Sequence, residues 1–180
     1  MKINKLDISD LYLIEPEIFK DDRGFFYESF NKKKFLQETG IDLNIVQENQ
    51  SYSKHNVLRG LHYQIEKEQG KLIKVNKGSI FDVAVDIRKK SPTFGHYFST
   101  ILSEENKRQL WIPEGFAHGF YVTSNEATVL YKINNYWDMH CERSIIWSDN
   151  DLNINWPFSK LPILSVKDQN AISFKNAEYI

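Results

Sequence analysis

The sequence has little cysteine and no long apolar run. Cys141 is the single cysteine among the 180 residues, so no intramolecular disulfide can form, and a lone thiol is typical of a protein in a reducing compartment. No apolar stretch approaches the roughly 20 residues that a membrane-spanning helix needs. Residues 1–7 lack the apolar segment and cleavage site of a secretory signal. We therefore expect a cytoplasmic protein that contacts no membrane.

An excess of charge of one sign is also missing. Lysine and arginine number 23, aspartate and glutamate 24, and the formal net charge is −1. Proteins that hold nucleic acid usually carry a basic excess, so we expect no nucleic-acid partner. The 8 glycines and 5 prolines are scattered, and no linker or repeat interrupts the chain. At a typical size of roughly 150 residues per domain, residues 1–180 are expected to form one domain.

Aromatic residues are abundant, at 14%, and polar and apolar residues alternate in many short segments. In residues 80–88 one face is apolar, and the other, which includes Asp82, Asp86 and Arg88, either meets solvent or lines a polar cavity. One helix is predicted, with Asn31 as its N-cap and Gly40 at its end. Further strands are predicted at residues 24–30, 45–52, 57–64, 71–75, 96–102, 109–112, 117–123, 128–134 and 144–147. This pattern indicates an all-β sandwich or barrel.

His62 lies in a predicted strand and is a candidate base, because the ordinary pKa of histidine suits proton transfer near neutral pH. A lone histidine is more often structural, and both interpretations remain open at this point. Under strict alternation Arg59 and His62 lie on opposite faces of the strand. A bulge at Gly60 would bring them to the same face.

Other candidates for chemistry stand on neighbouring segments. Lys71 begins the strand after His62 and could stabilise an oxyanion there, or it could be a solvated strand-end lysine. Arg23 stands on a turn before an aromatic strand, where its guanidinium could bind phosphate or simply meet solvent. Tyr131 and Tyr136 offer phenols as proton donors, although buried tyrosines are usually structural.

His118 has the Pro-x-Gly-x-x-His spacing of the second motif of metal-binding cupins. The first motif of those proteins usually supplies His-x-His, but here the matching residues are His62-Tyr63-Gln64. Zinc and iron sites need three or four ligands, which these segments do not provide. The chain also lacks the Gly-x-Gly-x-x-Gly pattern of dinucleotide binding. We therefore expect a pocket that uses neither metal nor cofactor.

Taken together and in this order, the segments resemble the dTDP-4-dehydrorhamnose 3,5-epimerase family. The matching stretches include Leu58-Arg-Gly-Leu-His-Tyr-Gln64 and Pro113-Glu-Gly-Phe-Ala-His-Gly-Phe120, together with residues 22–28, 47–49, 71–73, 82–88, 91–95, 131–132 and 164–168. The resemblance implies an all-β, cupin-type jelly-roll barrel with short peripheral helices. It also implies a homodimer, a dTDP-sugar substrate and a site without metal or cofactor.

The resemblance also implies a role for individual residues. His62 corresponds to the base that removes the proton next to the C4 ketone, and Asp168 to the carboxylate that orients it. Lys71 corresponds to the group that stabilises the enolate oxygen, and Tyr131 to the acid that returns a proton to the opposite face. The residues matching positions that contact or border the nucleotide-sugar are Arg23, Glu28, Gln47, Asn49, Arg59, His118 and Tyr136.

The implied reaction is epimerisation of a dTDP-linked 4-keto-6-deoxyhexose at C3, C5 or both, as in the conversion of dTDP-4-dehydro-6-deoxy-D-glucose to dTDP-4-dehydro-L-rhamnose. Ser144, Asn150 and the loop 66–69 depart from the family pattern, so the sugar and the number of inverted carbons stay open. Alternatives are an epimerase acting only at C3 or only at C5, a non-catalytic sugar-nucleotide-binding cupin, and a metal-dependent cupin, which would be sensitive to chelators.

Overall fold

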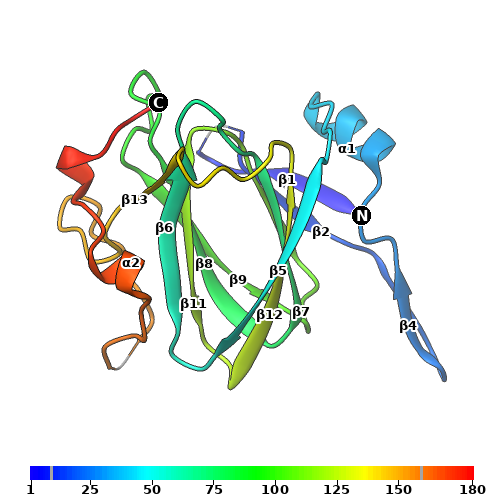
Figure 1. Ribbon diagram of the computed structural model, residues 1–180. Coiled ribbons are helices and arrows are strands. Elements are labelled where there is room, and N and C mark those ends of the chain that lie inside the picture. Colours follow the sequence, from blue (N-terminus) through cyan, green and yellow to red (C-terminus); the bar gives the residue numbers. More distant parts are fainter. Residues whose placement is uncertain (9, 159) are drawn as a thin grey trace.

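Two antiparallel sheets face each other in the computed structural model, which describes residues 1–8, 10–158 and 160–180 (Figure 1). One sheet has the strand order β1-β2-β10-β7-β12-β5, the other the order β13-β6-β11-β8-β9, and β3 and β4 form a separate hairpin. The strands are β1 (Lys2–Lys5), β2 (Tyr12–Glu15), β3 (Ile18–Asp21), β4 (Gly24–Tyr27), β5 (Gln47–Lys54), β6 (Leu58–Gln64), β7 (Lys71–Lys77), β8 (Ser79–Asp86), β9 (Tyr97–Ser103), β10 (Gln109–Ile112), β11 (Phe116–Val122), β12 (Glu126–Ile133) and β13 (Glu142–Ser144). The prediction of an all-β barrel is confirmed.

The main core lies between the two sheets. Side chains alternate along each strand, and the inward apolar ones include Ile73 and Val129 from the six-stranded sheet and Ile80 and Phe120 from the five-stranded sheet. Each of these four is almost completely buried. Burial of apolar surface on both inner faces stabilises the sandwich and leaves its polar end free to form a site.

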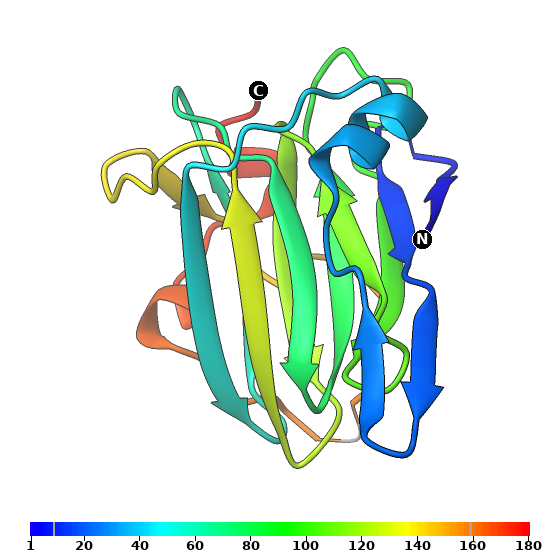
Figure 2. The ribbon, with the colours of Figure 1, turned by 90° about the vertical axis from the view of Figure 1, so that its right-hand side faces the viewer.

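The single long helix forms where the sequence predicts it. α1 (Lys32–Thr39) begins after Asn31, whose side chain accepts a hydrogen bond from Lys34 N at 3.0 Å. It ends at Gly40, which has a left-handed φ of 77°. Figure 2 looks onto the six-stranded sheet, with α1 near its upper end. No helix among the described residues is long and apolar enough to cross a membrane.

The C-terminal segment covers the outer face of the five-stranded sheet. It carries two short helices that the sequence did not predict, α2 (Val166–Gln169) and the 3₁₀ helix η1 (Phe174–Asn176). Trp156 and Phe174 pack there against apolar side chains of the sheet, among them Val83 and Val85. This cover brings α2 next to β6, which is how a residue near the C-terminus reaches the site.

The two carboxylates on the polar face of residues 80–88 do not meet solvent. Asp82 and Asp86 are both 0% exposed. Asp86 accepts hydrogen bonds from Arg88, Ser91 and Thr93, which makes it part of a structural network. Asp82 instead lies on the interior side of β8, beneath the site described below.

The β3–β4 hairpin extends away from the body of the barrel (Figure 1). Its aromatic side chains Phe19, Phe25 and Phe26 are 56%, 56% and 71% exposed. A run of exposed aromatics on an extended hairpin is unusual for a monomer and is typical of an interaction surface.

Candidate active site

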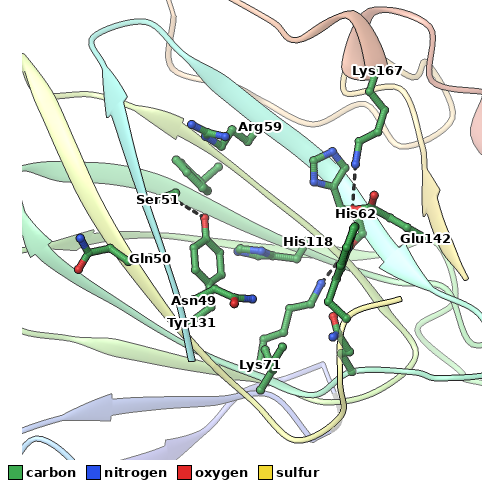
Figure 3. Close-up of a pocket in the computed structure, with 14 residues that line it drawn as sticks. Asn49, Gln50, Ser51, Arg59, His62, Lys71, His118, Tyr131, Glu142 and Lys167 are labelled. Carbon is green, nitrogen blue, oxygen red and sulfur yellow. Dashed lines mark hydrogen bonds and ion pairs between the residues drawn. The ribbon is translucent and has the colours of Figure 1, made fainter. Parts of the chain in front are cut away.

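A cavity of about 330 Å³ opens between the two sheets (Figure 3). Its walls come from β5, β7 and β12 of one sheet, from β6, β11 and β13 of the other, and from the loop before β7, the loop after β12 and helix α2. The lining residues are Asn49, Gln50, Ser51, Arg59, His62, Gln69, Lys71, His118, Phe120, Tyr131, Ile133, Trp137, Glu142 and Lys167.

On the wall formed by the five-stranded sheet, His62 is paired with Asp168. The distance from His62 Nε2 to Asp168 Oδ1 is 2.5 Å, and Asp168 also accepts from the N-cap hydroxyl of Ser165 at 2.8 Å. Burial, the largest effect, lowers the pKa of His62, although Asp168 opposes it. Burial alone would raise the pKa of Asp168, but its hydrogen bonds outweigh this effect and the pKa is lowered. His62 is therefore neutral at neutral pH, donates Nε2–H to a carboxylate and keeps Nδ1 as a basic nitrogen.

A bulge in β6 brings Arg59 and His62 to the same cavity. His118 pairs with His62 and Phe120 pairs with Arg59, so β6 advances by three residues where β11 advances by two. The bulge contains Gly60, which has a left-handed φ of 124°, and a Cβ at this position would come within 2.5 Å of Gly119 Cα. The structure therefore contains the bulge that the sequence left open at Gly60.

On the opposite wall, Lys71 and Tyr131 project from the six-stranded sheet. Lys71 Nζ donates to the carbonyl oxygen of His62 at 3.3 Å, and burial lowers its pKa to about 8, although the Glu142 carboxylate opposes the shift. The Tyr131 hydroxyl lies 3.0 Å from Ser51 Oγ, and burial raises its pKa to about 12. Tyr131 is therefore a protonated donor. Figure 3 shows it across the cavity from His62.

His118 stands on β11, on the same wall as His62 and beside it in the strand register. Its Nε2 is 2.8 Å from Asp82 Oδ2, and both side chains are buried. The sequence marked Asp82 only as part of a polar face, and the structure identifies its partner. Within residues 1–8, 10–158 and 160–180, no three His, Cys, Asp or Glu side chains are grouped so that they could hold a metal ion.

Some of the predicted binding residues lie outside this cavity. Asn49, Arg59 and His118 line it, but Arg23, Glu28, Gln47 and Tyr136 do not. The Arg23 side chain is 89% exposed on the β3–β4 hairpin and pairs with Asp21, and Glu28 accepts from Asn31 at 2.9 Å. Gln47 accepts from Trp137 N at 3.2 Å, and Tyr136 is 63% exposed beside it.

The structure also adds lining residues that the sequence did not identify. Glu142 and Lys167 form an ion pair of 2.9 Å at the mouth of the cavity, and Trp137 is 51% exposed at its rim. Lys167 directly precedes Asp168 in one of the matched segments, and this position could have identified it as a residue near the site. Glu142 on β13 and Trp137 in the loop after β12 reach the cavity only through the folding of the chain, so local sequence does not identify them.

Comparisons with known proteins agree with one another. A family model described as dTDP-4-dehydrorhamnose 3,5-epimerase matches residues 5–176. An epimerase of that name from Shigella flexneri is 54% identical over 180 residues, which is 99% of each chain. A Legionella pneumophila structure of dTDP-6-deoxy-D-glucose-3,5-epimerase in complex with dTDP-4-keto-L-rhamnose is 50% identical, with a TM-score of 0.95, over 98% of this chain and 94% of the other. A 3′-monoepimerase from Streptomyces bikiniensis in complex with dTDP-quinovose is 33% identical, with a TM-score of 0.88, over 93% and 85%.

Proposed function

Since the chain belongs to the dTDP-4-dehydrorhamnose 3,5-epimerase family, we propose that it inverts the configuration of a dTDP-linked 4-keto-6-deoxyhexose bound in this cavity. His62, Lys71 and Tyr131 carry out the reaction. The chain is an isomerase, and its substrate class is that of the family. The identities of 54% and 50% to the 3,5-epimerases of Shigella flexneri and Legionella pneumophila, against 33% to the monoepimerase, favour inversion at both C3 and C5.

The reaction proceeds through an enolate. His62 Nδ1 takes the proton from the carbon next to the C4 ketone, and the electron pair of the broken C–H bond passes to the ketone oxygen. The Lys71 ammonium stabilises that oxyanion, and a single such donor is typically worth about 3 kcal/mol of barrier. Tyr131 then donates its hydroxyl proton to the other face of the carbon. Proton exchange with solvent restores the phenol and the neutral imidazole, and Asp168 holds the ring in the tautomer that keeps Nδ1 basic.

The single observation that carries this proposal is that the base and the acid stand on opposite sheets. His62 comes from β6, whereas Tyr131 comes from β12. One group on one face can only exchange a proton, because it returns the proton to the face that it came from. Two groups on opposite faces supply what inversion requires.

The test is incubation with dTDP-4-keto-6-deoxyglucose in D₂O, followed by NMR. We expect deuterium at both C3 and C5, in inverted product. Label at C3 alone would instead identify a monoepimerase. Binding without any label would identify a non-catalytic sugar-nucleotide-binding protein and would overturn the proposed reaction.

We also propose that the protein is a cytoplasmic homodimer in which residues 1–180 form one domain. The cytoplasmic location is supported by the free thiol of Cys141. The dimer is supported by the exposed aromatics of the β3–β4 hairpin and by the position of Arg23, which is matched to the substrate but lies away from its own cavity. A second copy would both cover the hairpin and let Arg23 of the partner subunit reach the diphosphate.

The dimer predicts a native mass of twice the chain mass of 21.2 kDa. Light scattering at micromolar concentration measures it. Arg23→Ala should raise KM for the dTDP-sugar and leave the mass unchanged, because the substitution removes a charge and not the aromatic surface. A native mass near that of one chain would contradict the prediction.

The proposed roles also predict a bell-shaped pH dependence of kcat/KM, which reports groups of the free enzyme. Activity requires protonated Lys71, whose pKa is about 8, so kcat/KM should fall as the pH rises above that value. It requires neutral His62, whose pKa is lowered, so the acid limb should lie below pH 6.5. Tyr131, with a pKa of about 12, stays protonated throughout this range. A profile that stays flat to about pH 10 would remove Lys71 from its role.

A further inference from the structure

Gln64 is a buried amide that the reaction does not use. It stands on β6 two residues after His62, and its side chain is 3% exposed. Burial of an amide is unfavourable unless its donors and acceptor are hydrogen bonded. The partners of this side chain therefore indicate what it does.

The amide of Gln64 joins two loops at the mouth of the cavity. Its Nε2 donates to the carbonyl oxygen of Lys67 at 2.6 Å and to that of Tyr136 at 3.3 Å. Its Oε1 accepts from Asp138 N at 2.7 Å. Gln64 thus bonds the residues immediately before and after Trp137, whose side chain lines the cavity.

Other amide side chains attach the same loop to neighbouring segments. Gln69 Nε2 donates to the carbonyl oxygen of Asn135 at 2.9 Å, Gly70 N donates to Asn134 Oδ1 at 2.8 Å, and Gln47 Oε1 accepts from Trp137 N at 3.2 Å. The loop has no regular secondary structure of its own at residues 136–138. Its conformation therefore depends on these bonds, and Gln64 is the most buried of the glutamines that make them.

We propose that Gln64 is a positioning residue that holds Trp137 in place for the nucleotide end of the substrate. The inference rests on the proposed function, which requires a binding surface for the dTDP group of the substrate. An indole 51% exposed beside a polar cavity offers a flat surface on which a base can stack. Gln64 touches neither the sugar-facing nitrogen of His62 nor Lys71, so it acts on binding and not on proton transfer.

The two kinds of hydrogen bond explain why an amide is needed. Glutamate has the same length but no donor when ionised, so its oxygen would face the carbonyl oxygens of Lys67 and Tyr136. Methionine has a similar shape and supplies neither a strong donor nor a strong acceptor. Gln64→Glu and Gln64→Met therefore both release the loop while keeping the volume of the side chain.

The experiment measures steady-state kinetics with the dTDP-sugar, and calorimetric binding of dTDP and of inorganic pyrophosphate. We expect Gln64→Met to raise KM and the Kd of dTDP by about tenfold, because the base contact is lost. The Kd of pyrophosphate, which has no base, and kcat at saturation should both change by less than about threefold. Gln37→Met, at an exposed position on α1, is the matched control and should leave all four values unchanged.

A double-mutant cycle with Trp137→Ala separates positioning from general destabilisation. If Gln64 acts through Trp137, Gln64→Met should have almost no further effect on dTDP affinity once the indole is gone. Additive losses, an equal loss of pyrophosphate affinity, or wild-type dTDP affinity in Gln64→Met would each overturn the inference. If Gln64→Met does not fold, Gln64→Glu provides the same comparison. Absence of turnover and of dTDP binding in the wild type would instead overturn the proposed function, and the inference with it.

Discussion

Tyr131→Phe is expected to separate proton exchange from inversion. The substitution removes one oxygen and keeps the ring, so the packing of the barrel should survive. His62 still removes the proton and Lys71 still holds the enolate, but no donor remains on the opposite wall. The proton then returns from His62 to its original face, after exchange with solvent. In D₂O the variant should incorporate deuterium with retained configuration, while the inverted product falls by about 10²- to 10⁴-fold.

NMR of recovered substrate and product measures label and configuration separately. Tyr52→Phe is the matched control, because Tyr52 is exposed and does not line the cavity. Equal loss of exchange and inversion would mean that Tyr131 helps to form the enolate. Unchanged inversion in Tyr131→Phe would mean that another group, or water, is the acid.

Alternating sequence predicted most of the barrel. Helix α1 and strand β10 occur where the pattern places them, and the nine other predicted strands differ from the observed ones by at most three residues at either end. Strands β1, β2 and β3, of four residues each, were missed. Helix α2 was also missed, and its position against β6 depends on the packing of the whole C-terminal segment.

The candidate site also has a part that could be predicted from sequence and a part that could not. His62, Lys71 and Tyr131 could be identified from motifs, and the cavity does contain them. The rim could not be predicted, because its loop is held by side-chain-to-backbone hydrogen bonds such as those of Gln64, and these leave no periodic signal in sequence. The positions of Arg23 and Glu28 depend on where the hairpin lies, which local sequence does not determine.

His62→Ala is expected to abolish exchange at every epimerised carbon and to leave nucleotide-sugar affinity largely intact. The base is lost, whereas residues matched to the nucleotide-sugar, such as Arg59, remain. Since a positioned general base contributes roughly 10²- to 10⁴-fold, turnover should fall by at least that factor. Stopped incubations in D₂O measure exchange, and dTDP calorimetry measures binding. His140→Ala, at an exposed position outside the cavity, should behave as the wild type.

Asp168→Asn distinguishes the two members of the pair. It leaves the imidazole in place but removes the carboxylate that accepts from Nε2 at 2.5 Å. The amide can turn its own N–H towards Nε2, which favours the tautomer with the proton on Nδ1 and so disables the base in part of the population. Turnover should therefore fall less than in His62→Ala. Exchange at the wild-type rate in His62→Ala would mean that another group is the base. A larger loss of turnover in Asp168→Asn than in His62→Ala would mean that the carboxylate, and not the imidazole, takes the proton.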